Sequence, residues 1–144
     1  MWCSKILVAY DGSAPSKQAI KTAREIALQN PHAEFVFANV LRLYSSGAGA
    51  AGFDSVVIED AAPLRQELED AANSIPNPSK ICLLKGTSPA DLIVSCAKKE
   101  GCDLIIMGSR GQGGVKGFLG SVSYAVTKES PITVLIAKDG ANQR

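Results

Sequence analysis

The sequence lacks a long apolar run, since no stretch approaches the roughly 20 apolar residues of a membrane-spanning helix. Its opening, MWCSKILVAYDGS, has too short an apolar run for a secretory signal and leads directly into a strand pattern. An excess of one charge is also lacking, because 15 Lys and Arg residues balance 14 Asp and Glu residues for a net charge of +1. That balance leaves no excess of positive charge that would favour binding to nucleic acid or an anionic membrane. We therefore expect a cytoplasmic protein with neither of these partners.

Residues that commonly bind metals or carry electrons are few. The four cysteines, at positions 3, 82, 96 and 102, show no CxxC or zinc-ligand spacing, and the single histidine, His32, follows Pro31 in an expected turn. Such thiols fit a reduced cytoplasm and serve most simply as small core side chains. No catalytic set of side chains is visible, so we expect no metal site and, at most, slow ATP hydrolysis.

Two common nucleotide motifs are missing as well. No GxxxxGK[ST] occurs, so the phosphate-binding lysine of that motif and its magnesium-binding hydroxyl are absent. The dinucleotide fingerprint should follow the first strand, yet DGSAPS follows it and the glycines come much later. This order argues against an ordinary NAD-dependent dehydrogenase.

Apolar runs and helical patterns alternate along the chain. Strands are expected at residues 5–10, 34–41, 80–84, 103–107 and 132–137. Helices are expected from Ser13 to Asn30, from about 62 to 74, from Ser88 onward, and from Ser121 to Glu129. Continuous apolar strands, each followed by a helix, indicate parallel strands that are buried on both faces. The prediction is one domain, residues 1–144, with a doubly wound, Rossmann-like α/β fold and a five-stranded, mostly parallel sheet of order 3-2-1-4-5.

The segment GSRGQGGVKGFLGSVS, from Gly108 to Ser123, has six glycines among its sixteen residues and follows the expected fourth strand. Glycines let successive backbone N–H groups converge on an anion, and Gly120-Ser121 adds the positive end of a helix. In the predicted order, the first and fourth strands are neighbours at the point where the winding reverses, so the DGS turn faces this segment. Asp11 in that turn is a candidate acceptor for a ribose hydroxyl, a base amine or a metal ion, or it caps the next helix.

Three separated motifs resemble the universal stress protein family. They are KILVAYDGS, GTSPADLIVSCAKKEGCDLIIMGSRG, and GSRG followed by eight residues and GS, and the resemblance extends from Lys5 to Lys138. It implies a five-stranded α/β sheet, commonly in a homodimer, and ATP-binding members carry GxxG, nine residues and G[ST]. Carried over position by position, it implies a nucleotide site made of Ala9, Asp11, Val40, Met107, Gly108, Ser109, Arg110, Gly111, Gly120, Ser121, Val122 and Ser123.

The same resemblance implies a role for each part of this site. The ends of the first two strands lie near the base and ribose, residues 107–108 flank the ribose, and residues 109–111 and 120–123 enclose the phosphates. The chain departs from the pattern in having eight residues, not nine, between Gly111 and Gly120. The expected ligand is therefore ATP, or ADP or AMP, with Mg bound through the nucleotide and Asp11.

Two functions remain open from the sequence. The first is a cytoplasmic, ATP-binding stress-response or regulatory protein that acts by binding. The alternative is a dimeric interaction protein of the same fold that binds no nucleotide, while an FMN enzyme in the same crevice would lack an evident redox or acid/base group. In both main readings, the apolar strand 132–137 lies at the edge of the sheet and is expected to pair with a second copy.

Overall fold

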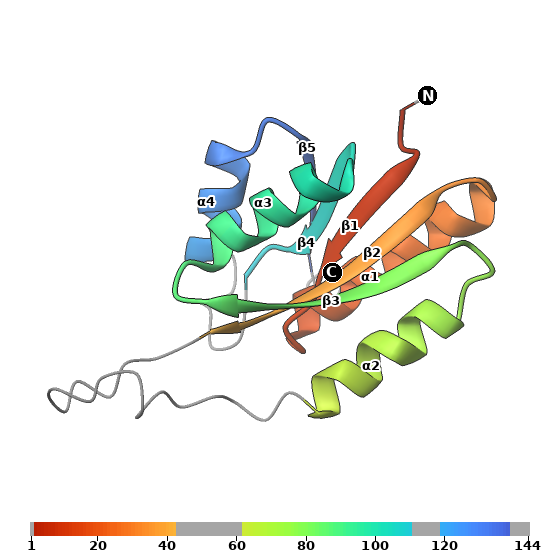
Figure 1. The fold of residues 1–144 in the computed structure, drawn as a ribbon, viewed down its shortest axis with the longest axis horizontal. Helices are drawn as coiled ribbons and strands as arrows, with labels where there is room; N and C mark the ends of the chain where they lie inside the picture. Colours follow the sequence, from red (N-terminus) through yellow and green to blue (C-terminus); the bar gives the residue numbers. More distant parts are fainter. Residues whose placement is uncertain (1, 43–61, 111–118, 139–144) are drawn as a thin grey trace, which may run out of the picture.

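The computed structural model describes residues 2–42, 62–110 and 119–138, and in these ranges strands and helices alternate (Figure 1). The elements are β1 (Lys5–Ala9), α1 (Ala14–Gln29), β2 (Glu34–Arg42), α2 (Ala62–Asn73), β3 (Ser79–Gly86), α3 (Pro89–Glu100), β4 (Leu104–Gly108), α4 (Ser121–Glu129) and β5 (Thr133–Ala137). None of the helices in these ranges is both long enough and apolar enough to cross a membrane.

The five strands form one parallel sheet of order β3-β2-β1-β4-β5, which confirms the predicted fold and strand order. The central strand β1 pairs with β2 through Ile6↔Phe35 and with β4 through Ile6↔Leu104. The chain therefore winds outward from β1 to β3 on one side and from β4 to β5 on the other. The point of reversal lies between β1 and β4.

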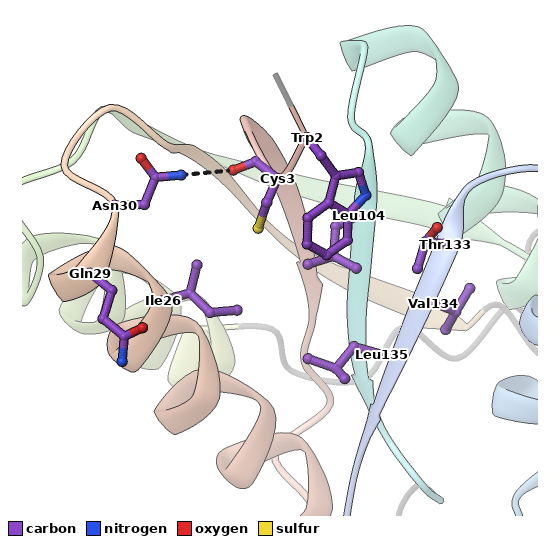
Figure 2. Close-up of a pocket in the computed structure, with 9 residues that line it drawn as sticks. All are labelled: Trp2, Cys3, Ile26, Gln29, Asn30, Leu104, Thr133, Val134 and Leu135. Carbon is purple, nitrogen blue, oxygen red and sulfur yellow. Dashed lines mark hydrogen bonds between the residues drawn. The ribbon is translucent and has the colours of Figure 1, made fainter.

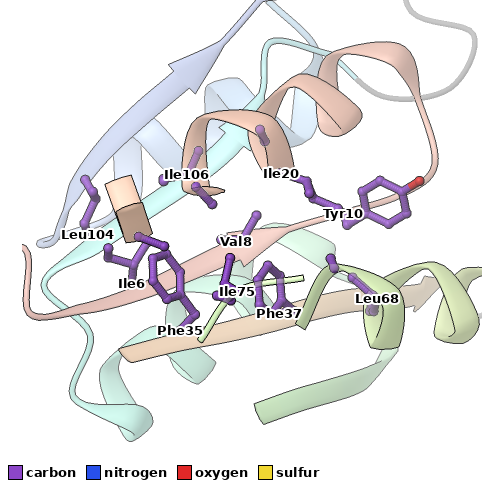
Figure 3. Packing of buried hydrophobic residues seen from close by; sticks show 14 of the residues in the cluster. Ile6, Val8, Tyr10, Ile20, Phe35, Phe37, Leu68, Ile75, Leu104 and Ile106 are labelled. Atoms are coloured by element: carbon purple, nitrogen blue, oxygen red, sulfur yellow. The ribbon is translucent and has the colours of Figure 1, made fainter. Parts of the chain in front are cut away.

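Helices cover both faces of the sheet, and the alternation along β1 divides the core accordingly. Ile6 and Val8 pack with side chains of α1 and α2, while Leu7 and Ala9 pack with those of α3 and α4. Figure 3 shows the first of these two layers, in which Leu68 of α2 packs toward the sheet. Two buried layers hold the strand ends in fixed positions, which is what a binding site at the end of the sheet requires.

The strand bounds differ from the sequence expectation mainly at β3. The expected strand covered residues 80–84, whereas β3 runs from Ser79 to Gly86 and pairs with β2 along its whole length. Its side chains are mostly half-buried or exposed, as suits the edge of a sheet, so the ends of β3 carry little apolar signal. Pairing with β2 extends β3 beyond the residues whose apolar pattern indicates a strand.

Candidate functional site

The candidate site lies where the carboxyl ends of β1 and β4 come together. Ala9 ends β1, Met107 and Gly108 end β4, and the buried Ser109 follows, so the structure brings these predicted residues to one edge of the sheet. Ala9 and Met107 belong to the buried cluster on the α3 and α4 face, and Val40 near the end of β2 packs against it. The positions expected near the base, Ala9 and Val40, thus share one layer with Met107, which is expected to flank the ribose.

The turn after β1 is held by short-range hydrogen bonds. Gly12 has a φ of 87°, a left-handed conformation that favours glycine, and it reverses the chain between β1 and α1. The Asp11 carboxylate accepts a hydrogen bond from the Ser13 backbone N–H at 2.9 Å, and the Ser13 hydroxyl caps α1 by accepting one from Ser16 N–H at 3.3 Å. Asp11 therefore shapes the turn through Oδ1, while Ser13, not Asp11, is the helix cap.

Close packing against α1 explains why position 108 is a glycine. A Cβ atom at this position would lie 2.7 Å from the backbone carbon of Pro15 and from the backbone nitrogen of Ser16. Real Cβ atoms do not approach backbone so closely, so only glycine lets β4 end against the first turn of α1. The Ser13 hydroxyl also donates to the Arg110 carbonyl at 3.4 Å. The turn after β1 and the segment after β4 thus contact each other directly.

The start of α4 is tied to the end of β4 by two hydrogen bonds. The Gly120 N–H donates to the Ser109 carbonyl at 2.7 Å, and the buried Ser123 hydroxyl donates to the Gly108 carbonyl, also at 2.7 Å. Ser109 N–H in turn donates to the Ala137 carbonyl of β5 at 2.8 Å. These bonds fix where α4 begins relative to the end of β4.

The first turn of α4 has the features of an anion site. Gly120 occupies the N-cap position, and no side chain there accepts a hydrogen bond from the helix, in contrast to Ser13 of α1. The first N–H groups of any helix have no partner within it, and the helix dipole places partial positive charge there. Ser121 is exposed, Val122 is half-buried, and Ser123 is buried with its hydroxyl already donated. The two serines therefore differ, since only the Ser121 side chain faces solvent.

The predicted site is described up to Arg110 and again from Gly120. Gly111 lies outside the described residues, so the middle of the glycine-rich segment cannot be compared with its prediction. Within the described ranges, no group of three or more His, Cys, Asp or Glu side chains is placed to hold a metal ion.

Two residues next to the site escaped the sequence analysis. The buried Asn39 side chain donates to the Tyr10 carbonyl at 2.7 Å, and its Oδ1 is buried without a partner. The Tyr10 hydroxyl hydrogen-bonds to the Glu67 carboxylate of α2, and burial, followed by this bond, raises the pKa of Tyr10. The two contacts set the chain direction immediately before Asp11. An asparagine within the apolar strand EFVFANVL was the available signal.

An apolar hollow in the described surface lies elsewhere on the sheet. It measures about 490 Å³ and is lined mainly by apolar side chains, among them Trp2, Ile26, Leu104 and Leu135 (Figure 2). Leu104 begins β4 and Trp2 precedes β1, so this hollow is at the amino ends of the strands. None of the side chains that line it is charged, and it is separate from the candidate site at the carboxyl ends.

Comparisons with known proteins agree with this architecture. The model of the Universal stress protein family matches residues 3–138. A universal stress protein of Thermus aquaticus is 35% identical over 137 residues, which cover 92% of this chain and 97% of that protein.

Solved structures give the same result. The structure of a hypothetical protein of Methanocaldococcus jannaschii has a TM-score of 0.76 at 27% identity, covering 96% of this chain and 97% of its own. A universal stress protein in complex with cAMP has a TM-score of 0.69 at 26% identity, covering 97% of this chain and 100% of its own.

Proposed function

The chain belongs to the universal stress protein family, and we propose that it is a cytoplasmic protein that binds an adenine nucleotide in a stress response or its regulation. It acts by binding and not by efficient catalysis. One observation carries this proposal: the first turn of α4, which has no side-chain cap, lies at the crevice end of the sheet beside the turn after β1. The related structure with cAMP supports an adenine nucleotide as the ligand.

The proposed ligand lies across the carboxyl ends of β2, β1 and β4. Ala9 and Val40 lie beside the base and Met107 flanks the ribose, since all three belong to or pack against one apolar cluster. Asp11 accepts a hydrogen bond from the ribose, because its carboxylate stands in the turn directly after β1. The sugar then follows the backbone at Gly108 toward α4.

The phosphates in this proposal meet backbone amides and one exposed hydroxyl. The Ser121 and Val122 N–H groups at the helix start have no intrahelical partners, and helix N-termini favour anions for this reason, while Gly120 N–H donates to the Ser109 carbonyl and holds the helix start in place. Ser109, Arg110 and Gly111 complete the loop on the other side. ATP is the proposed ligand, with ADP and AMP as shorter forms, and magnesium would be held by the phosphates with the help of Asp11.

A thermal-shift titration tests nucleotide binding. Protein freed of copurified nucleotide is titrated with ATP, ADP, AMP and cAMP, each with and without magnesium, and GTP serves as the control for the base. A ligand at about 100 times its Kd stabilises the folded state by about 2.7 kcal/mol, which raises the melting temperature measurably. Absence of any shift with millimolar adenine nucleotides refutes the proposal. An equal shift with GTP refutes recognition of the base.

A dimeric interaction protein that binds no nucleotide is the second candidate, and β5 is the strand through which either candidate would pair with a second copy. Leu135 in the middle of β5 is 39% exposed, and the apolar hollow of Figure 2 continues beside it. A strand edge with an exposed leucine is a template for pairing with a second copy. Sedimentation velocity of Leu135→Glu tests the dimer, and Leu28→Glu, on an exposed leucine of α1, is the matched control. A wild-type chain that remains monomeric at micromolar concentration excludes this dimer.

A further inference from the structure

Three of the four cysteines gather on one face of the sheet. Cys82 lies on β3, Cys96 lies on α3, and Cys102 follows the end of α3. All three belong to or pack against the buried cluster between the sheet and helices α3 and α4. Cys3 is not a member of this cluster and packs against the opposite layer instead.

Local structure places Cys82 and Cys96 opposite each other. Along β3, Cys82 and Leu84 pack against the α3 layer, while the alternate residues pack against the α2 layer. Cys82 pairs across the sheet with Ala38, whose small side chain leaves room for the thiol of a facing helix. Cys96 belongs to the buried side of α3, the helix that lies over β3 and β2. Cys82 and Cys96, 14 residues apart in the sequence, thus lie on a strand and a helix that pack against each other.

The two thiols are also close enough to affect each other electrostatically. Burial, followed by the charge and hydrogen bonding of Cys82, raises the pKa of Cys96 to about 12. Burial similarly raises the pKa of Cys102 to about 11, with a smaller opposing effect from Lys5. At the solvent side, Lys80 donates to the Glu100 carboxylate at 3.0 Å.

We propose that Cys82 and Cys96 are a redox pair that forms a reversible disulfide between β3 and α3 on exposure to a low-molecular-weight disulfide. The sulfur of Cys82, on the edge strand and only partly buried, first attacks one sulfur of oxidised glutathione as the thiolate. A mixed disulfide forms, the glutathione S–S bond breaks, and one glutathione thiolate leaves.

The second step closes the bond within the protein. Cys96 loses its proton to solvent, and its thiolate attacks the Cys82 sulfur of the mixed disulfide. The bond from Cys82 to glutathione breaks, and the second glutathione leaves as a thiolate that takes up a proton. The two protein thiols are together oxidised by two electrons, and one glutathione disulfide is reduced to two thiols.

The charged groups around the pair set the pH dependence of this reaction. Lys5 and Lys80 face the cluster from β1 and β3, and Glu100 faces it from α3. Because the Cys96 thiol is held protonated, closure is slow at neutral pH. Its rate rises about tenfold per pH unit between pH 7 and 9, following the thiolate fraction. Glu100→Gln leaves the Lys80 charge unneutralised beside the thiols and is expected to accelerate closure.

Mass spectrometry of the full chain under native conditions tests the pair. Reduced protein is incubated with oxidised glutathione, quenched with acid and digested with trypsin without reduction. We expect two of the four free thiols to be lost, with the peptide 81–85 joined to the peptide 86–98 through Cys82 and Cys96. Dithiothreitol should restore all four.

Variants distinguish this pair from general thiol oxidation. Cys96→Ser is expected to stop at a glutathione adduct on Cys82, whereas Cys102→Ser should form the internal disulfide as the wild type does. A glutathione adduct that persists on wild-type Cys82 at pH 9, a disulfide to Cys3 or Cys102, or four unchanged thiols would each overturn the proposal. So would a disulfide that forms only in denaturant. None of these results depends on nucleotide binding.

Discussion

Replacing Ser121 with glutamate separates nucleotide binding from folding at the start of α4. Ser121 is the first helical residue, its side chain is exposed, and no side chain caps this end of the helix. A carboxylate there meets the positive end of the helix dipole, which stabilises the ligand-free protein by about 0.3–1 kcal/mol. The same carboxylate stands where the proposed phosphates would bind. The substitution should therefore raise the stability of the ligand-free protein and lower its affinity for nucleotide.

The loss of binding follows from the charge alone. Two unit charges about 5 Å apart repel by about 0.8 kcal/mol in water and about 3.3 kcal/mol at an effective dielectric constant of 20. Because Ser121 is exposed, screening favours the lower part of this range, about 1–2 kcal/mol, or a Kd that rises about 5- to 30-fold. Higher salt should reduce the difference.

Calorimetric titration with AMP and ATP measures the change in Kd, and thermal unfolding without ligand measures stability. Thr127→Glu is the control, since it adds the same charge to an exposed position in the last turn of α4. The control should bind nucleotide as the wild type does. An unchanged Kd for Ser121→Glu, or equal weakening in both variants, would refute the assignment of phosphates to the start of α4.

Three further predictions concern the stability of the fold. Ser123→Ala removes the buried hydrogen bond to the Gly108 carbonyl and should lower the free energy of unfolding in urea by about 1–3 kcal/mol; restoration by Ser123→Thr would support the hydroxyl as the cause. Gly108→Ala introduces a Cβ at 2.7 Å from the Pro15 backbone and should lower the free energy of unfolding by about 1–3 kcal/mol. Gly86→Ala is the control and should lower it less, because its Cβ meets only the flexible tip of a leucine at 2.8 Å. Equal losses of stability in the two variants would contradict the packing argument. Burial opposes the ionisation of Asp103, but hydrogen bonds from Ser4 and Lys5 N–H outweigh it and lower its pKa. Its contribution to stability is therefore present above the unfolded-state pKa of about 4 and lost as pH falls through the lower folded-state value. When the free energy of unfolding is measured across acid pH, Asp103→Asn should lack this part of the pH dependence.

The fold was predictable because its signals are local and repeated. Each of the buried strands β1, β2 and β4 is a continuous apolar run, and glycine, proline or serine marks the turns on either side. The order of the strands then followed from the rules for parallel crossovers. The extent of β3 could not be predicted, since its outer residues are ordered by pairing with β2 and carry no apolar pattern.

The sequence indicates which residues make up the candidate site, but not which of them are exposed and which are bound within the fold. Ser121 and Ser123 look equivalent in GSVS, yet one is exposed and the other donates its hydroxyl to Gly108. That difference depends on the orientation of α4, which is a tertiary property. Gly108 likewise reads as part of a phosphate loop, while its contact with Pro15 appears only when α1 packs on β4. Ser123 and Gly108 therefore have a role in the scaffold that the sequence pattern does not reveal.

The hydrogen bonds at the ends of the glycine-rich segment bear directly on its shortened spacing. Gly120 N–H is bound to the Ser109 carbonyl, and Ser123 is bound to Gly108, so the start of α4 is fixed relative to β4 by contacts outside residues 111–118. One residue fewer between Gly111 and Gly120 therefore need not move the helix amides. It changes only the length of chain available above them. In the proposed complex, the base and the first phosphate depend on the fixed ends, and the number of phosphates depends on the segment between them.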